Sequence, residues 1–533
     1  MHKFKFNRHR SFSLLTLAAL LTTAWEVEAQ PANVLLTRAE QSGYTETTRH
    51  DEALVFLESI AESSPYITIH RFGYSNEGRP LLLAVVGELD EMSSTAIRHS
   101  DLTRVYIQGN IHGGEVEGKE ATLMLLRELA NGEHREWLET MILLIAPIYN
   151  ADGNERIALT HRSRQHGPIG GVGQRPNAQG YDLNRDHMKL ESPEARSFVK
   201  MLKEYDPHVL MDLHATNGTY HGYHLTYAPP LHPNTAIPIV DLLRKRLLPT
   251  VTRTIKDAYG WDFYYYGNTP RPGSGRALGW YTFDHRPRFG NNYGGLRNRV
   301  SILSEAYSYL PFKDRITVTK RFVEEILNYV ETHGEAIRAV VESANGESIV
   351  GQHLAVRAVF KQSAEPVDIL LGEVMPERNP YTGQQMLRRL DTQTLTRMYE
   401  YGTFAASAFE RVPRAYYVPS NLENVIERLE AHGIHTELLD AESTREVEQF
   451  QIGSTSSTDR EFQGHRERTL TGSYELTQAV LAAGTRVVPL DQPLGRLVFM
   501  LLEPLSDDGF VNWNLLDDVL VGAAVYPIVR TVE

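Results

Sequence analysis

The 533-residue chain contains no cysteine. This absence excludes disulfide bonds and cysteine-ligated metal sites, so stability must come from core burial and any bound metal, and His, Asp and Glu remain as metal ligands. Basic residues are also in the minority, with 54 Lys and Arg against 67 Asp and Glu and a net charge of −13. This balance argues against binding of nucleic-acid phosphates as the main role.

Long apolar runs are absent after the first 30 residues, so we expect no stable membrane insertion of the mature protein. The N-terminus differs: residues 3–10 are basic, residues 12–25 are apolar and uncharged, and Val27 and Ala29 suit a cleavage site. This layout predicts a signal peptide over residues 1–29 and a secreted or periplasmic protein. The alternative is a membrane anchor, but the apolar run is shorter than the roughly 20 residues that span a bilayer.

The length of the chain favours two domains. Residues 30–345 alternate apolar strand patterns with amphipathic helix patterns, which predicts a layered α/β domain. Residues 346–533 predict a smaller β-rich or mixed accessory domain without an assigned role. The expected strands are 81–86, 104–108, 141–147, 209–213, 300–303, 355–360, 367–371, 486–489 and 497–502, and the expected helices include 53–63, 117–129 and 316–341.

Two long polar segments, residues 161–180 and 267–295, are rich in Gly and Pro and interrupt the first domain. Loops of this length inside a compact domain are usually functional or disordered. The second segment is also rich in Arg and Tyr, which favours the wall of a cleft over a flexible linker.

The first candidate for chemistry is His112-Gly113-Gly114-Glu115, at the end of an expected strand and the start of an expected helix. Imidazole nitrogen and carboxylate oxygen are good zinc donors, and the two glycines allow a tight backbone path. A lone His-x-x-Glu is a weak signal among 21 histidines. Its position gives it weight, because ligands bind beyond the carboxyl ends of strands in open α/β sheets.

A catalytic zinc needs a third protein ligand and an open position. His214 ends the apolar strand at 209–213 and is the preferred third ligand, with His221 and His224 as competitors further along. Zinc hydrolysis also needs a carboxylate that takes a proton from water and returns it to the leaving group. Glu305, at the end of the apolar strand that begins at Val300, is the candidate.

The order of these residues resembles that of the zinc carboxypeptidase family, whose His₂Glu zinc site is a standard example. The resemblance covers roughly residues 45–340 and extends beyond the ligands. The matching segments are Gly-Tyr-Ser-Asn-Glu-Gly-Arg-Pro at 73–80, Pro-Ile-Tyr-Asn-Ala-Asp-Gly at 147–153, and Gly-Tyr-Asp-Leu-Asn-Arg at 180–185. The resemblance implies a three-layer α/β/α domain with a mixed central sheet, and one Zn²⁺ held by His112, Glu115 and His214.

The resemblance also implies roles for four further residues. Asn184 and Arg185 would grip the terminal carboxylate of a peptide substrate, a group that the planar guanidinium matches bidentately. Asp182 would orient the first zinc histidine. Arg175 would stabilise the oxyanion, as its spacing from Asn184 resembles that in the cytosolic branch of the family. Arg162 and Arg164 are alternatives for this role.

Two departures from the family pattern affect the substrate site. Gly113 and Gly114 replace an arginine that the digestive enzymes carry between their zinc His and Glu. The substrate-covering tyrosine of the family has no secure counterpart, and Tyr293 is preferred over Tyr281. The segment Asn-Arg-Asp at 184–186, followed by Ser-Pro-Glu at 192–194, also differs from the digestive enzymes and suggests a divergent bacterial branch.

The sequence therefore predicts a secreted zinc metallocarboxypeptidase that uses Glu305 as general base and acid. Two alternatives stay open. One is a zinc amidase of cell-wall peptides or a deacylase of N-acyl amino acids. The other is a non-catalytic protein that binds carboxylates.

Overall fold

The computed structural model describes Met1 and residues 35–531. The predicted signal peptide at residues 1–29 lies outside these residues, apart from Met1. Within the described part of the chain, no helix combines the length and apolar character needed to cross a membrane.

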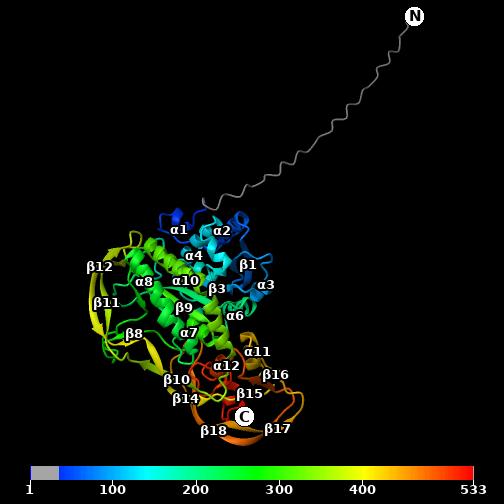
Figure 1. The fold of residues 1–533 in the computed structure, drawn as a ribbon. Coiled ribbons are helices and arrows are strands. Elements are labelled where there is room, and N and C mark those ends of the chain that lie inside the picture. Colours follow the sequence, from blue (N-terminus) through cyan, green and yellow to red (C-terminus); the bar gives the residue numbers. More distant parts are fainter. Residues whose placement is uncertain (2–34, 532–533) are drawn as a thin grey trace.

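An eight-stranded mixed sheet forms the centre of the first domain, in the order β1-β2-β4-β3-β5-β9-β6-β7. Strands β1, β3 and β9 of this sheet are labelled in Figure 1. Strands β4, β3, β5 and β9 run parallel, and β1, β2 and β6 pair antiparallel. The strands are β1 Ile67–Tyr74, β2 Pro80–Val86, β3 Thr103–Gly109, β4 Met141–Ala146, β5 Val209–Thr216, β6 Leu225–Ala228, β7 Phe263–Tyr265 and β9 Val300–Tyr307. All residues of β3, β4 and β5 are buried, as expected for strands covered on both faces.

Helices cover the sheet in two groups. The helices of the first group pack against one another. They are α2 His50–Ser63, α4 Glu117–Ala130, α7 Ile237–Leu242, α8 Leu248–Tyr259 and α10 Phe312–Gly346. The second group comprises α3 Ser94–His99, α6 Pro193–Tyr205 and α9 Gly290–Leu296. The short helices α1 Arg38–Gln41 and α5 Ala151–Glu155 lie in connections. The predicted three-layer α/β/α arrangement with a mixed sheet is confirmed.

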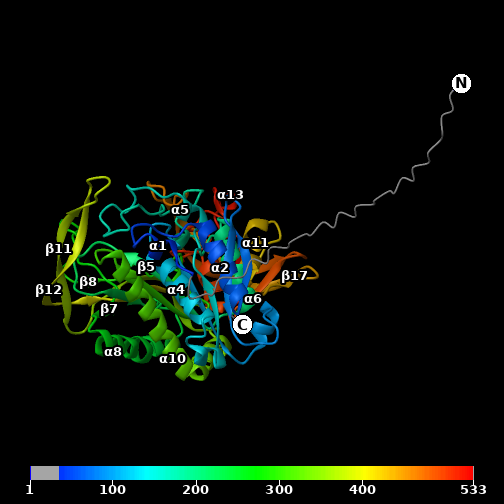
Figure 2. The same cartoon turned by 90° about the horizontal axis from the view of Figure 1, so that it is seen from above.

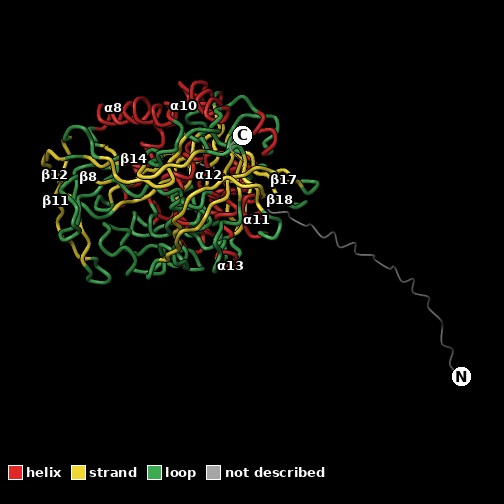
Figure 3. Tube along the Cα trace, turned by 90° about the horizontal axis from the view of Figure 1, so that it is seen from below, coloured by secondary structure: helices red, strands yellow, loops and turns green. Residues whose placement is uncertain are grey.

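The C-terminal region is β-rich, as predicted, and contains two long hairpins at opposite sides of the molecule (Figures 1 and 2). One hairpin is β11 Val367–Arg378 with β12 Gln385–Met398, and the other is β17 Ser443–Ser457 with β18 Arg468–Leu481. The tube in Figure 3 shows β14 and α12 between them. The remaining elements are β10 His353–Lys361, β13 Glu400–Tyr401, β14 Thr403–Arg411, β15 Ala415–Val418, α11 Glu423–His432, β16 Glu437–Leu438, β19 Arg486–Pro489, α12 Gly495–Leu502, α13 Asp517–Leu520 and β20 Val529–Thr531.

One predicted strand is wrong. Residues 497–502 lie in the helix α12, and all eight residues of this helix are buried. A short, continuous apolar run has the same pattern in a buried helix and in a buried strand, so periodicity cannot separate the two. Residues 367–371 were correctly predicted as part of β11, but β12, β17 and β18 were not predicted. Their largely exposed residues lack the apolar alternation of a half-buried strand.

The C-terminal region shares its core with the first domain. A single hydrophobic cluster contains residues from β4, from α9 and from α12. Polar contacts also cross the predicted boundary at residues 345/346: Arg288 Nε donates to Asp508 Oδ1 at 2.8 Å, and Asn298 Nδ2 donates to Pro493 O at 2.9 Å. Hence α12 and the segment after it cover a face that the first domain would otherwise expose to water.

We expect a chain that ends at residue 346 to lose cooperative unfolding and to aggregate. Each fully buried Leu or Val side chain contributes on the order of 1.5–3 kcal/mol, and truncation exposes the partners of many such side chains. Thermal unfolding followed by circular dichroism is the measurement. A control that only shortens the exposed turn at residues 380–383 should keep a wild-type transition. A sharp transition in the truncated protein would contradict the shared core.

Candidate metal centre and active site

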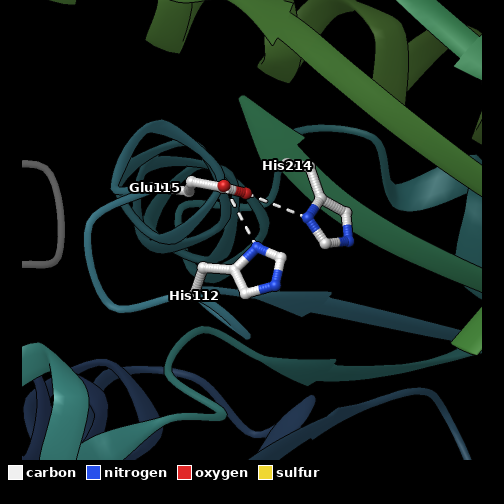
Figure 4. Close-up of side chains that lie close together, drawn as sticks. All are labelled: His112, Glu115 and His214. Carbon is white, nitrogen blue, oxygen red and sulfur yellow. Dashed lines mark hydrogen bonds and ion pairs between the residues drawn. The ribbon is translucent and has the colours of Figure 1, made fainter. Parts of the chain in front are cut away.

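Three side chains converge at the carboxyl edge of the central sheet. Glu115 Oε1 lies 3.1 Å from His112 Nδ1, and Glu115 Oε2 lies 2.9 Å from His214 Nδ1 (Figure 4). All three residues are buried, and one ligand atom from each lies within 4.8 Å of the others. The predicted ligands are thus together, each with a donor atom facing the same point.

The turn after β3 explains how His112 and Glu115 reach the same point. Asn110 adopts a left-handed backbone with φ 63°, and its Nδ2 donates to the carbonyl of Glu115 at 3.1 Å. A Cβ on Gly113 would come within 2.4 Å of Gly153 C, and one on Gly114 within 2.9 Å of Gly173 O. The turn is therefore pressed against neighbouring backbone, and no side chain fits at either glycine.

The outer nitrogen of each histidine faces a carboxylate. His112 Nε2 lies 3.1 Å from Asp182 Oδ1, and His214 Nε2 lies 2.8 Å from Asp212 Oδ2. A carboxylate at Nε2 stabilises the tautomer with its proton there, which leaves the Nδ1 lone pair free to bind a metal. Two imidazoles, each held at Nε2 by a carboxylate, and the carboxylate of Glu115 fit the ligand set of a catalytic zinc.

The charges around the ligands are balanced by neighbouring groups. Burial alone would raise the pKa of Glu115, but His112 and Arg162 hold it well below its usual range. Arg162 Nη1 donates to Glu115 Oε1 at 3.0 Å, and its Nη2 donates to Ala215 O at 2.8 Å. Arg162 is thus bound on several sides within the site and supports Glu115.

Glu305 lies beside the ligands. It pairs in register with His214, because β9 is the parallel neighbour of β5. Its carboxyl lines the cleft and is partly exposed, and burial together with Glu115 raises its pKa to about 8. Glu305 is thus a carboxyl with high proton affinity next to the metal position.

The ligands lie in a cleft with a volume of about 150 Å³. Four other side chains predicted to act at the site also line the cleft: Arg175, Asn184, Arg185 and Glu305. Asp182 does not line it and lies behind His112. The lining residues are His112, Glu115, Arg162, Arg175, Asn184, Arg185, His214, Ala215, Thr216, Asn217, Tyr266, Phe283, Phe289, Leu303 and Glu305.

Asn184 and Arg185 belong to a short 3₁₀ turn, Leu183–Arg185. Asn184 Oδ1 accepts from the Gly290 amide at 2.8 Å, so its NH₂ group is the end that remains for a ligand. The Arg185 guanidinium stacks 3.8 Å from the centre of the Phe289 ring. Among the described residues, no carboxylate lies within 4.0 Å of Arg185, so its charge in the cleft has no acidic partner.

Arg175, in the predicted loop at residues 161–180, points toward the proposed metal ligands. Its Nη2 lies 2.8 Å from Asp182 Oδ2, and its Nη1 lies 3.4 Å from His112 Nδ1. Its two alternatives lie elsewhere: Arg162 is bound to Glu115, and Arg164 Nη2 donates to the Tyr220 hydroxyl at 2.8 Å. The position of Arg175 is compatible with an oxyanion beside the metal.

The prediction for Tyr293 needs correction. Tyr293 is fully buried in α9, and its hydroxyl lies 2.8 Å from His432 Nδ1. It does not line the cleft, because α9 packs this ring inward against α11. Tyr281 is also absent from the cleft lining, whereas Tyr266 lines it. Burial and the nearby Glu305 raise the pKa of Tyr266 to about 12, so its hydroxyl stays protonated and can donate.

The two competing histidines do not join the ligand group. The His221 ring stacks on Tyr307 with centroids 4.0 Å apart, and burial lowers the pKa of His221 to about 3. His224 Nδ1 accepts from the Asp262 amide at 3.2 Å. Both are therefore neutral histidines of the neighbouring core.

One residue of the site comes from the C-terminal region. Gln463, in the turn between β17 and β18, accepts a hydrogen bond from the Asp182 amide through its Oε1 at 2.8 Å. Another residue of this turn, His465, places its Nε2 2.7 Å from Glu191 Oε1. The tip of the hairpin thus touches the segment that carries the carboxylate behind His112.

Sequence reasoning missed Asn110, Asp212, Tyr266 and Gln463. Asp212 had a usable signal, because it lies two residues before His214 on the same strand and therefore faces the same side of the sheet. Asn110 directly precedes the His-x-x-Glu turn and is a residue type that tolerates a left-handed backbone. Gln463 lies 281 positions from Asp182, and nothing in its local sequence indicates the contact.

We expect Gly113→Ala to lose most of its bound zinc and to unfold at a lower temperature. The added Cβ clashes with backbone atoms that cannot rotate away, and overpacking of this kind costs about 1–3 kcal/mol. Zinc content by mass spectrometry and thermal unfolding are the measurements. Gly346→Ala is the matched control, since a Cβ there meets nothing within 4 Å. A wild-type zinc content in Gly113→Ala would contradict the conclusion that no side chain fits at this position.

Comparisons with known proteins find similarity to carboxypeptidases. The family model for zinc carboxypeptidases matches residues 53–209. Carboxypeptidase 2 of the fungus Trichophyton equinum is 25% identical over 519 residues, which cover 92% of this chain and 88% of the relative. Carboxypeptidase E of Caenorhabditis elegans is 35% identical over 144 residues, which cover 26% and 28%. A solved metallo-carboxypeptidase from Burkholderia cenocepacia aligns at 18% identity and a TM-score of 0.40 over 53% of this chain and 69% of that one.

The matched segment contains His112, Glu115, Arg175, Asn184 and Arg185. The relatives that span most of the chain are themselves carboxypeptidases by name. Together with the buried His-Glu-His group, these findings support a zinc metallopeptidase, and residues 53–209 are similar to the zinc carboxypeptidase family.

Proposed function

We propose that the protein is a secreted metallocarboxypeptidase that removes the last residue of a peptide with a free C-terminal carboxylate. One observation carries the proposal: the cleft that contains the His-Glu-His group also contains Arg185, a cation without an acidic partner among the described residues. A peptide carboxylate supplies that partner. The scissile bond next to this carboxylate then falls beside the metal ligands.

Binding of the substrate follows from the donors in the cleft. The Arg185 guanidinium is held flat on Phe289 and offers two parallel N–H groups to a carboxylate. The Asn184 NH₂ group adds a further donor, because its oxygen is already bound by the Gly290 amide. Both side chains are positioned before the substrate arrives, which lowers the entropic cost of orienting it.

His112, Glu115 and His214 would hold one Zn²⁺, which polarises the scissile carbonyl and lowers the pKa of an attacking water. Glu305 lies at the end of the neighbouring strand, where it would accept the proton of that water and return it to the leaving amine. Arg175 would donate to the oxygen of the attacked carbonyl as negative charge develops there. Asp182 would keep both His112 and Arg175 in place, since its two oxygens contact one each.

The division of the chain and its location are part of the proposal. We propose that residues 1–29 are removed on export to the periplasm or the medium, and that residues 30–345 form the catalytic domain. Residues 346–533 would serve to shape and support the cleft, because Gln463 binds the Asp182 amide and Arg389 Nη2 donates to Gly222 O at 2.6 Å. Assignment to a divergent bacterial branch stays a prediction.

We expect Glu305→Gln to keep its zinc and to lose turnover by a factor on the order of 10²–10⁴, because an amide cannot accept the proton of the attacking water. Steady-state rates on a peptide substrate and zinc content are the measurements. Glu335→Gln, an exposed change on α10, is the matched control and should behave as wild type. A Glu305→Gln enzyme with near-wild-type kcat would remove Glu305 from this role.

We expect the wild type to cleave a peptide with a free C-terminus and to leave the same peptide with a C-terminal amide intact. Arg185→Ala should reduce kcat/KM for the free acid by on the order of a hundredfold, since a buried charge-assisted pair is lost. Arg185→Lys should restore part of the loss, because the ammonium keeps the charge but not the planar fork. Equal cleavage of acid and amide by the wild type would favour an amidase or an endopeptidase instead.

A further inference from the structure

A second, larger cavity adjoins the cleft. Its volume is about 940 Å³, and Asn217, Tyr266 and Phe283 line both spaces, so the cavity and the cleft are neighbours. Its walls come from residues 217–220, which follow the strand of His214, and from the 267–283 part of the predicted cleft-wall loop. We call this cavity the side chamber.

The charge of the side chamber is of one sign. Three arginines line it, and no acidic side chain does so among the residues that the structure describes. Arg271 and Arg276 are exposed, and within the described chain no carboxylate lies within 4.0 Å of Arg164, Arg271 or Arg276. This concentration of unpaired positive charge is unexpected in a chain whose net charge is −13.

The floor of the side chamber is held in shape by hydrogen bonds. Asn268 Oδ1 accepts from the Thr219 amide at 3.0 Å, and Asn268 Nδ2 donates to the Tyr266 hydroxyl at 3.0 Å. The Thr269 amide donates to Thr219 Oγ1 at 2.8 Å. These bonds tie the two walls together, so the chamber is a fixed feature beside the cleft.

The far wall is supported by the C-terminal region. The Trp280 amide donates to Tyr399 O at 2.9 Å, and the Tyr281 ring stacks on Tyr401 with centroids 4.1 Å apart. The Arg276 guanidinium lies 5.3 Å from the centre of the Tyr281 ring and 5.0 Å from that of Phe360. Aromatic faces therefore position this arginine at the chamber without neutralising it.

We call Asn184 and Arg185 together the carboxylate grip. The position of the side chamber relative to this grip indicates what enters the chamber. Asn184 and Arg185 line the cleft and not the chamber, whereas Asn217 and Tyr266 line both. A peptide whose C-terminal carboxylate is on Arg185 places its scissile bond at the metal ligands. The rest of the peptide, N-terminal to that bond, must then leave the cleft, and the chamber is the neighbouring space, lined in common by Asn217, Tyr266 and Phe283.

We propose that the side chamber binds acidic side chains of the substrate, at positions N-terminal to the scissile bond. Arg164, Arg271 and Arg276 would be the specificity-determining residues. The assignment of a peptide to the chamber rests on the proposed carboxypeptidase function. Arginine is suited to the task because its fork of N–H groups matches Asp and Glu carboxylates, and the lack of competing acidic groups leaves all three arginines available.

The experiment compares peptides that share their two C-terminal residues and differ upstream, with Glu-Glu, Ala-Ala or Lys-Lys at the two preceding positions. We expect kcat/KM to be about tenfold higher for the Glu-Glu peptide than for the Ala-Ala peptide, because several exposed ion pairs each contribute a small free energy. Arg271→Ala/Arg276→Ala should abolish most of this ratio by lowering kcat/KM for the Glu-Glu peptide. The ratio should also fall at high salt, which screens exposed charges.

Two controls keep the outcomes distinct. Arg253→Ala removes an exposed arginine from α8, away from the chamber, and should keep the wild-type ratio. Binding of the three peptides to Glu305→Gln, followed by fluorescence anisotropy, tests the chamber without turnover. If the wild type cleaves no peptide, the proposed function fails. The binding series still decides whether the side chamber prefers acidic side chains.

Equal binding and cleavage of the Glu-Glu and Ala-Ala peptides would overturn the inference. So would a preference for Glu-Glu that persists in Arg271→Ala/Arg276→Ala. A preference that appears only when the acidic residue is the C-terminal one would overturn the placement upstream of the scissile bond. Displacement of labelled Glu-Glu peptide by a sulfated polysaccharide at lower concentration than by the unlabelled peptide would overturn the choice of a peptide ligand.

Discussion

The site depends on the contact of one buried carboxylate with two imidazoles. Glu115 faces the Nδ1 atoms of His112 and His214, and each imidazole is held at its other nitrogen by a further carboxylate. Removing both histidines from solvent together with three carboxylates would be costly without a compensating positive charge at the centre. A bound divalent cation would supply that charge, and Arg162 supplies part of it from the protein side.

Asp182 connects this centre to the rest of the molecule. Its Oδ1 contacts His112 and accepts from the Asn184 amide, and its Oδ2 accepts from Arg175. Its own amide is bound by Gln463 from the C-terminal region. Asp182 therefore supports three features at once: the proposed metal ligand His112, the proposed oxyanion donor Arg175, and the turn that contains Asn184 and Arg185. This gives a physical reason for the long β17–β18 hairpin, whose tip ends at this point.

The sequence predicted the parts of the site that depend on strand ends. His112, His214 and Glu305 each follow an apolar run, and parallel strands bring their carboxyl ends to one edge of a sheet. The sequence alone therefore predicts that these three side chains converge. Burial of β3, β5 and β9 was predictable for the same reason. What could not be predicted depends on contacts between distant segments, such as Gln463 with Asp182, or on which way a ring faces, as for Tyr293. The helix α12 was missed because six apolar residues in a row carry no periodicity.

The arginines around the cleft fall into two groups by their partners. Arg162 is bound to Glu115 and Arg175 to Asp182, so their charges are used to balance acidic groups of the protein. Arg185 and the three arginines of the side chamber have no such partner among the described residues. Acidic groups at these four positions would have to come from a ligand, one at Arg185 and others in the neighbouring side chamber. Unpaired positive charge thus lies both in the cleft that contains the His-Glu-His group and in the side chamber beside it, where the proposed peptide would place its C-terminal carboxylate and its acidic side chains.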